Sequence, residues 1–214
     1  MGELIFLDQR RVDRSLAPRN MRPAFFFDLS CPFSYLVAER VERELGEAEW
    51  IPVAASAVSR ALGDSDVPSI KALAQRRAAA LRLGLVWPER FPFEAPRALR
   101  AAAHAAELGA GPRFALAASR LAFCGGFDLE DPEILAEAAA AASVPWEECL
   151  TAARETERDG ALQMTADGLR SRAVRSLPAI RVGRRWLQGE REFVTACAMQ
   201  REPAAFVRPM VPPG

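Results

Sequence analysis

One strand-to-helix turn constrains the fold of this 214-residue chain more than any other feature. Residues 24–29 form a short apolar run rich in aromatics, which predicts a buried strand. Pro32 suits the first position of a helix because its missing N–H needs no partner there. Apolar residues then recur at every fourth position until Gly46, which predicts an amphipathic helix that ends at this glycine. A second apolar run at 50–54 completes a β-α-β unit with parallel strands.

In the remainder of the chain the spacing of apolar residues changes twice, first to a helical pattern and then to a strand pattern. From 68 to about 175 the pattern is helical throughout, and proline and glycine signals divide it into five expected helices, at 68–84, 95–108, 114–123, 132–143 and from 145 onward. Two short runs at 178–182 and 185–188, separated by a Gly-containing dipeptide, then predict a β-hairpin. An amphipathic helix over 190–201 follows. The expected order is β-α-β, a helical block, then β-β-α, which is an α/β fold.

Composition excludes several classes of function. Lys+Arg and Asp+Glu are equal at 28 each, so the chain has no basic field for a nucleic-acid partner. His104 is the only histidine, which rules out sites that need two imidazoles, and we expect no metal. No apolar stretch is long enough to span a membrane, and the N-terminus lacks a secretory signal. We therefore expect a cytoplasmic protein without a membrane partner, in which His104 is a packed or surface residue.

The four cysteines form no close pair, and a reducing compartment disfavours disulfides. Cys124, Cys149 and Cys197 lie in helix-like segments, where we expect buried, inert thiols. Cys31 instead lies at the cap of a helix, facing unpaired N–H groups and the positive end of the macrodipole, so its pKa is expected to fall. Ser34, in the first turn, could donate to the sulfur. The sequence predicts that Cys31 is a nucleophile, and the alternative is that it only caps and packs.

An aromatic loop at 87–93 is punctuated by two prolines. Exposed aromatics of this kind are typical of the rim of a binding site. The alternative is a loop that its aromatic rings hold against the core.

The expected order of elements is that of a thioredoxin fold with an all-helical insertion. The run at 27–36, Phe-Asp-Leu-Ser-Cys-Pro-Phe-Ser-Tyr-Leu, resembles the strand-to-helix turn of the DsbA superfamily. It is most similar to the branch of 2-hydroxychromene-2-carboxylate isomerases and kappa-class glutathione transferases, whose turn reads roughly D-x-x-S-P-[FY]-S-[YW]-L. Further matches lie at 84–85, 91–93, 97–100, 128–132 and 176–178, so the resemblance covers about residues 24–200.

The resemblance divides the chain into two units and a tail. Residues 22–60 and 174–202 are expected to form the thioredoxin-like domain. Residues 61–173 form the helical insertion between them. The proline-rich tail at 203–214 is expected to be irregular.

Two residues of the turn set the chemistry that the resemblance implies. Dithiol oxidoreductases of this fold carry Cys-x-x-Cys, whereas Ser34 occupies the resolving position in this chain, so an external thiol must finish each cycle. Glutathione is the implied co-substrate. The isomerase and transferase branch normally has serine at the position of Cys31, and a cysteine there favours a mixed disulfide with glutathione.

The binding residues are implied in the same way. Leu177 and Pro178 resemble the segment carrying the cis-proline of the fold, where the preceding residue offers its backbone to a bound peptide or to glutathione. The alternative is a trans proline that opens an ordinary strand. Ser30 and Pro32 complete the turn side of this site.

After the hairpin, the acidic residue of the Gly-x-Asp-Arg motif holds the amino end of glutathione in the family. Arg191 stands at the aspartate position in this chain. Glu190, or else Glu192, is the expected substitute.

The sequence thus predicts a DsbA-like monothiol oxidoreductase or transferase linked to glutathione, with Cys31 as nucleophile and a small-molecule or disulfide substrate. The first alternative is a glutathione-dependent isomerase similar to the 2-hydroxychromene-2-carboxylate enzymes. In that case Lys71 is the one remaining candidate to hold a ring substrate, and otherwise it is a solvated charge. The second alternative is an inactive thioredoxin-fold binding module. Relatives in this branch are commonly dimers, so a homodimer is expected.

Overall fold

The computed structural model describes residues 22–59, 63 and 65–201. The expected tail at 203–214 lies outside the described residues.

Four strands form one sheet in the order β2-β1-β3-β4. Their bounds are β1 Ala24–Phe27, β2 Glu49–Pro52, β3 Ala179–Val182 and β4 Arg185–Gln188. β1 pairs in parallel with β2 and antiparallel with β3, and β3 and β4 form the antiparallel hairpin. The predicted thioredoxin-like α/β fold is confirmed.

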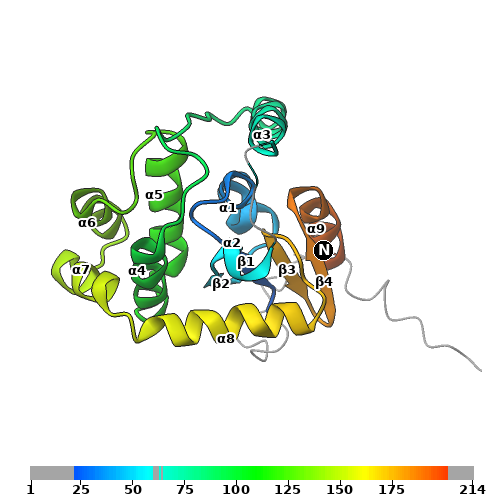
Figure 1. Ribbon diagram of the computed structural model, residues 1–214. Coiled ribbons are helices and arrows are strands. Elements are labelled where there is room, and N and C mark those ends of the chain that lie inside the picture. The colour runs from blue at the N-terminus through cyan, green and yellow to red at the C-terminus, as the bar shows by residue number, and fades with distance from the viewer. Residues whose placement is uncertain (1–21, 60–62, 64, 202–214) are drawn as a thin grey trace, which may run out of the picture.

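Successive side chains of β1 point to opposite faces of the sheet, and both faces are apolar. Phe25 and Phe27 join the larger core, which also contains buried side chains of α1 (Pro32–Glu44), α4 (Pro96–Glu107) and α5 (Gly111–Phe123). Phe26 points to the opposite face, where it joins a smaller core with Leu169 of α8 (Arg158–Ser171). Burial on both faces explains why the β1 sequence is a continuous apolar run rather than an alternating one. In Figure 1, α8 runs along the lower edge of the molecule beneath the sheet.

The bounds of the other helices are α2 Ala55–Val58, α3 Val67–Leu81, α6 Pro132–Ala141, α7 Trp146–Arg154, a 3-10 turn η4 Glu190–Glu192 and α9 Phe193–Arg201. Among them, α6 and α7 lie beyond α4 and α5, on the side away from the sheet (Figure 1). The larger core is continuous from the sheet into α6 and α7, and α8 packs on the sheet itself. Side chains of the segment 61–173 therefore pack directly against the thioredoxin-like part of the chain.

Several helix boundaries differ from the sequence expectation, and the backbone explains two of the differences. The helix expected over 68–84 ends at Leu81, because Arg82 adopts the left-handed conformation (φ 57°) and Leu83 N–H turns back to the carbonyl of Ala78. The helix expected from 145 is divided into α7 and α8, since Glu155 is extended (ψ 93°) between them. This break lets α8 change direction and cover the sheet.

No helix in the described part of the chain is long and apolar enough to cross a lipid bilayer.

Candidate active site

Cys31 is the N-cap residue of α1, with an extended backbone (φ −97°, ψ 113°) and Pro32 directly after it. Its N–H donates to the carbonyl of Asp28 at 3.2 Å, which closes the turn between β1 and α1. The side chain does not bond to the backbone as a cap, so the sulfur is left for other contacts. Cys31 Sγ lies 3.8 Å from the carbonyl oxygen of Leu177, a residue 146 positions away in the sequence. The fold thus brings the turn and the segment before β3 together.

Asp28 stabilises the turn through hydrogen bonds of its side chain and backbone. Its carboxylate accepts from the N–H of Ser30 at 2.7 Å and from the Ser30 hydroxyl at 2.8 Å, and it also accepts from the N–H of Ala55. The Asp28 N–H donates to the hydroxyl oxygen of Ser34 at 3.3 Å. Burial raises the pKa of Asp28, and the hydrogen bonds from Ser30 and Ala55 oppose this effect. From the sequence, Asp28 is recognisable only as part of the turn motif. Its contact with the backbone of Ala55 could not be predicted, because an alanine carries no sequence signal for such a bond.

The predicted fall in the Cys31 pKa is wrong. Burial raises the pKa of the Cys31 thiol above its ordinary value, and the nearby Asp28 carboxylate adds to this rise. The Ser34 hydroxyl and the N–H groups of Ser34 and Phe33 act in the opposite direction, so the expected influence of the helix start is present. Loss of water around the sulfur outweighs it. Burial depends on the tertiary structure, which is why the local sequence pattern predicts the wrong sign.

A pocket of about 650 Å³ opens in front of Cys31. One wall is the turn itself, with Asp28, Ser30, Pro32 and Phe33, and Leu177 lies beside it. The other walls come from residues 54–59, the loop before α4, and α8. The loop contributes Phe91, Phe93 and Glu94, and α8 contributes Asp159, Leu162 and Gln163. Ile70 of α3 and Leu99 of α4 complete the lining. The α8 wall was not predicted, because a solvated helix face gives the same sequence pattern.

The structure brings most of the predicted site residues to this pocket. Ser30, Cys31, Pro32 and Leu177 line it, and Ser34 is buried behind the sulfur. The Leu177–Pro178 peptide bond is cis. Pro178 is buried behind the pocket wall, and its carbonyl accepts from Gly189 N–H at 2.7 Å.

Glu190 is not brought to the pocket. Only 4% of its side chain is exposed, and it bonds to Arg40 Nη1 of α1 at 3.4 Å and to Arg77 Nε of α3 at 2.6 Å. Arg40 also forms two bonds of 3.0 Å to Glu44 and lies over the Phe193 ring. We therefore correct the expected ligand-binding role of Glu190, because its charge is already used to join α1, α3 and η4.

The sequence allows two interpretations each for Lys71 and for the aromatic loop. Phe91 and Phe93 line the pocket and also pack against the larger core, so the loop serves as rim and as core. Lys71 is outside the pocket wall, and its Nζ lies 5.2 Å from the ring centroid of Trp87 and 5.5 Å from that of Phe91. The Lys71 ammonium therefore contacts aromatic rings of the loop.

The other cysteines divide into two kinds. Cys149 and Cys197 are buried as expected, and burial raises the pKa of Cys149 to about 11. The expectation that Cys124 is buried is wrong. It is exposed at the C-terminal end of α5, with its sulfur 3.0 Å from the Tyr35 hydroxyl. The helix ends at this residue, so the thiol faces out of the core.

His104 is largely covered, near carboxylates of Glu107 and Glu148 at 3.8 and 3.9 Å. It lies outside the pocket wall.

A family comparison decides the relationship. The family model of the DSBA-like thioredoxin domain matches residues 24–196 of this chain, which includes the turn, the helical block and the hairpin. The chain belongs to this family. No curated protein sequence matches the chain.

Solved structures share the fold of this DSBA-like protein. A 2-hydroxychromene-2-carboxylate isomerase has a TM-score of 0.72 at 15% identity, over 88% of this chain and 100% of that one. A proposed DsbA oxidoreductase from Streptomyces coelicolor has a TM-score of 0.72 at 16% identity, over 90% and 94%. A proposed protein disulfide isomerase from Nitrosomonas europaea has a TM-score of 0.65 at 13% identity, over 86% and 99%. At these identities the likeness concerns the fold.

Proposed function

We propose that this DSBA-like protein is a monothiol oxidoreductase that exchanges disulfides at Cys31. One observation carries the proposal: the only cysteine sulfur that faces the described pocket lies at the start of α1, beside the backbone of Leu177. Ser34 stands at the position where a second cysteine would resolve the mixed disulfide. An external thiol must therefore complete the reaction, and glutathione is the proposed supplier.

The reaction balances without a metal or a bound cofactor. The Cys31 thiol loses its proton to solvent, and the thiolate attacks one sulfur of a substrate disulfide. A Cys31 disulfide forms, the substrate S–S bond breaks, and the second substrate sulfur leaves with the electron pair and takes up a proton. Glutathione thiolate then attacks the substrate sulfur of the mixed disulfide. A glutathione–substrate disulfide forms, and Cys31 leaves as a thiolate that takes up a proton. The Ser34 hydroxyl and the N–H groups of Ser34 and Phe33 favour the thiolate at both steps, because they lower the pKa of Cys31 against the effect of burial.

Leu177 supplies the other half of the proposed site. Its carbonyl oxygen lies near the Cys31 sulfur, where it can accept a hydrogen bond from the thiol in the resting protein. A substrate extended along this segment would take the same carbonyl as a backbone partner. The sulfur would then be freed from Leu177 at the moment when the substrate arrives.

Turnover of a small disulfide tests the proposal. The wild-type protein should reduce hydroxyethyl disulfide in the presence of glutathione, glutathione reductase and its nicotinamide cofactor. Cys31→Ser should abolish this activity, and Cys124→Ser should retain it, because Cys124 lies outside the pocket wall. Activity that survives Cys31→Ser would contradict the proposal.

A second candidate function is a glutathione-dependent isomerase, and the raised pKa of Cys31 favours it. Burial raises the pKa of Cys31 and so favours the protonated thiol, which could act as a neutral hydrogen-bond donor in the way that a serine hydroxyl does. The two functions separate on one variant. Isomerisation of 2-hydroxychromene-2-carboxylate with glutathione would survive Cys31→Ser, whereas disulfide exchange would not.

A further inference from the structure

The charged side chains on the described pocket wall all have the same sign. Asp28, Glu94 and Asp159 line the pocket, and none of the other described residues of its wall is lysine, arginine or histidine. A pocket that holds acidic groups in low-dielectric surroundings concentrates cations and disfavours anions. How strongly the pocket attracts or repels a charged ligand depends on how far each carboxylate is already neutralised by other groups of the protein.

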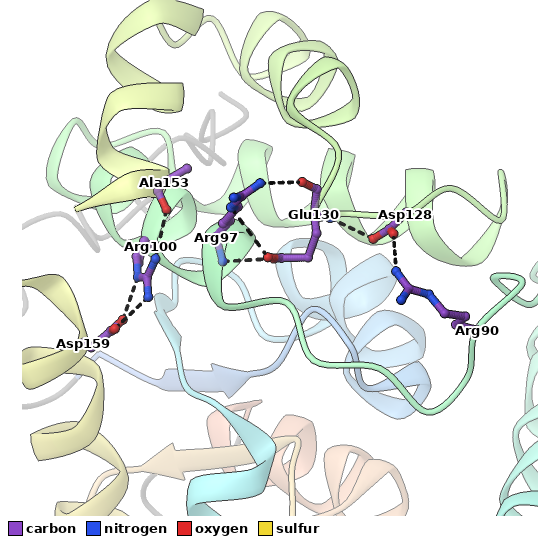
Figure 2. Close-up of polar contacts among 7 residues, drawn as sticks. All are labelled: Arg90, Arg97, Arg100, Asp128, Glu130, Ala153 and Asp159. Atoms are coloured by element: carbon purple, nitrogen blue, oxygen red, sulfur yellow. Dashed lines mark hydrogen bonds and ion pairs between the residues drawn. The ribbon is translucent and has the colours of Figure 1, made fainter. Parts of the chain in front are cut away.

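Two of the three carboxylates have strong partners. Asp159 is held by Arg100, whose Nε and Nη2 each lie 2.7 Å from one of its oxygens (Figure 2). The Arg100 hydrogen bond lowers the pKa of Asp159, so this pair contributes little net charge. Asp28 accepts three hydrogen bonds from Ser30 and Ala55, which line the pocket beside it.

Glu94 differs from both. It is exposed at the pocket wall, and it has no hydrogen bond or ion pair with the described part of the chain. The nearby start of α4 does not use it either, because Glu130 already accepts from Arg97 N–H at 3.0 Å, as Figure 2 shows. Its charge reaches Asp28, whose pKa it raises further. Two like charges that share a pocket would be relieved by a cation and opposed by an anion.

The rest of the wall is apolar. Phe33, Phe91, Phe93, Leu99 and Leu162 face the same space as Glu94. Burial of an apolar group against these side chains supplies binding energy without regard to charge. The carboxylate is then the group that discriminates between apolar ligands of different charge.

We propose that the pocket binds an apolar group with a neutral or positive charge beside Cys31 and repels anionic groups, and that Glu94 sets this preference. The proposal rests on the proposed function in one respect, namely that Cys31 is the reacting sulfur. Glutathione carries two carboxylates, so it would act from solvent as the attacking thiol, and the substrate half of the mixed disulfide would occupy the pocket. The favoured substrates are apolar disulfides that are uncharged or bear an ammonium group.

Thiol reagents of matched size and different charge test this preference at Cys31. We would use methanethiosulfonates that carry a trimethylammonium, a hydroxyl or a sulfonate group. In each case the Cys31 thiolate attacks the sulfenyl sulfur, a disulfide forms, and methanesulfinate leaves with the electron pair. Rates are measured by mass spectrometry of the Cys31 peptide in a Cys124→Ser background and divided by the rates with mercaptoethanol. This division removes the intrinsic reactivity of each reagent.

The cationic reagent should react at least about tenfold faster than the anionic one at low ionic strength, where charges act over about 30 Å. Glu94→Gln should reduce this ratio severalfold. Glu89→Gln is the matched control, since Glu89 is an exposed carboxylate of the preceding loop that is absent from the pocket wall. It should leave the ratio unchanged. About 1 M salt, with a Debye length of about 3 Å, should bring the ratio close to one in every variant.

Each outcome separates this proposal from the proposed function. A wild-type ratio near one, or a ratio that Glu94→Gln leaves unchanged, overturns the charge preference even if disulfide turnover is normal. A clear preference in a protein that turns over no disulfide supports the charge preference and contradicts the proposed function. A Cys31 that none of the three reagents modifies would overturn both, because both need an accessible sulfur.

Discussion

The Cys31 sulfur lies 3.8 Å from the carbonyl oxygen of Leu177, although the two residues are 146 positions apart. A thiol can donate to this oxygen, whereas a thiolate cannot, so the contact favours the protonated form. Burial acts in the same direction and raises the pKa of Cys31. The resting site therefore holds a thiol that becomes a nucleophile when it loses its proton, rather than a permanent thiolate.

The first prediction concerns the pH dependence of Cys31. Its alkylation rate should keep rising with pH beyond about 8.5, the value for a free thiol, because only the thiolate reacts and its folded-state pKa is raised. The measurement is iodoacetamide modification of the Cys31 peptide at a series of pH values. A plateau that begins below the free-thiol value would show that the helix start outweighs burial after all.

The same raised pKa affects stability. The unfolded chain ionises Cys31 at its ordinary pKa of about 8.5, whereas the folded chain ionises it only at a higher pH. The contribution of Cys31 to the unfolding free energy is therefore fully present below about pH 8.5 and is lost as pH rises through the folded-state pKa. Relative to Cys31→Ser, the unfolding free energy of the wild type should fall over this range. Urea unfolding of both proteins at increasing pH measures the difference. A difference that stays constant or grows with pH would contradict a raised pKa in the folded state.

Ser34→Cys should convert the site from a monothiol to a dithiol. Cys31 and residue 34 then have the spacing of a Cys-x-x-Cys motif at the start of α1, so the variant can close an internal disulfide. We expect it to oxidise a reduced thiol substrate in one turnover without glutathione, which the wild type cannot do. Ser34→Ala is the matched control, because it removes the hydroxyl without adding a thiol.

Glu190→Gln should destabilise the fold. The change leaves Arg40 and Arg77 without their shared carboxylate, and loss of one partner of a buried ion pair costs about 3 kcal/mol or more. Glu44 still pairs with Arg40, so we expect the lower end of this range. Glu192→Gln, at an exposed residue of the same turn, should change stability by less than about 0.5 kcal/mol. Equal effects of the two substitutions in denaturant unfolding would contradict the role assigned to Glu190.

Tyr35→Phe should cost about 1 kcal/mol of stability. The Tyr35 hydroxyl donates to the Gly84 carbonyl at 2.8 Å, and its ring is buried against Phe123. Cys124→Ser should cost less, because a serine hydroxyl at this exposed position can still contact Tyr35. Thermal unfolding of the two variants checks this order. The reverse order would mean that Cys124 is more important to the core than its exposure indicates.

The fold was largely predictable because local signals agreed with the tertiary structure. The apolar run before Cys31, Pro32 at the helix start, and the Gly-containing hairpin turn each specify an element on their own. The division between α7 and α8 was missed, since Glu155 and its neighbours carry no proline or glycine signal to end a helix.

The site was predictable only in part. Cys31 is recognisable because the helix start is a local feature, and Leu177 because of the resemblance. Asp159 and Glu94 reach the pocket through packing that no local pattern records, and burial reverses the expected pKa shift of Cys31. Glu190 was misassigned because the sequence does not reveal that Arg40 and Arg77 already share its charge.

The most direct test of disulfide exchange at Cys31 is intact-mass analysis after reaction with dithiodipyridine, a neutral aromatic disulfide. In a Cys124→Ser background the protein should gain one thiopyridyl group on Cys31 and release one equivalent of thiopyridone, and excess glutathione should return it to the mass of the free thiol. Cys149 and Cys197 are buried and should stay unmodified. A protein that gains no group at Cys31, or an adduct that glutathione does not remove, would contradict the account.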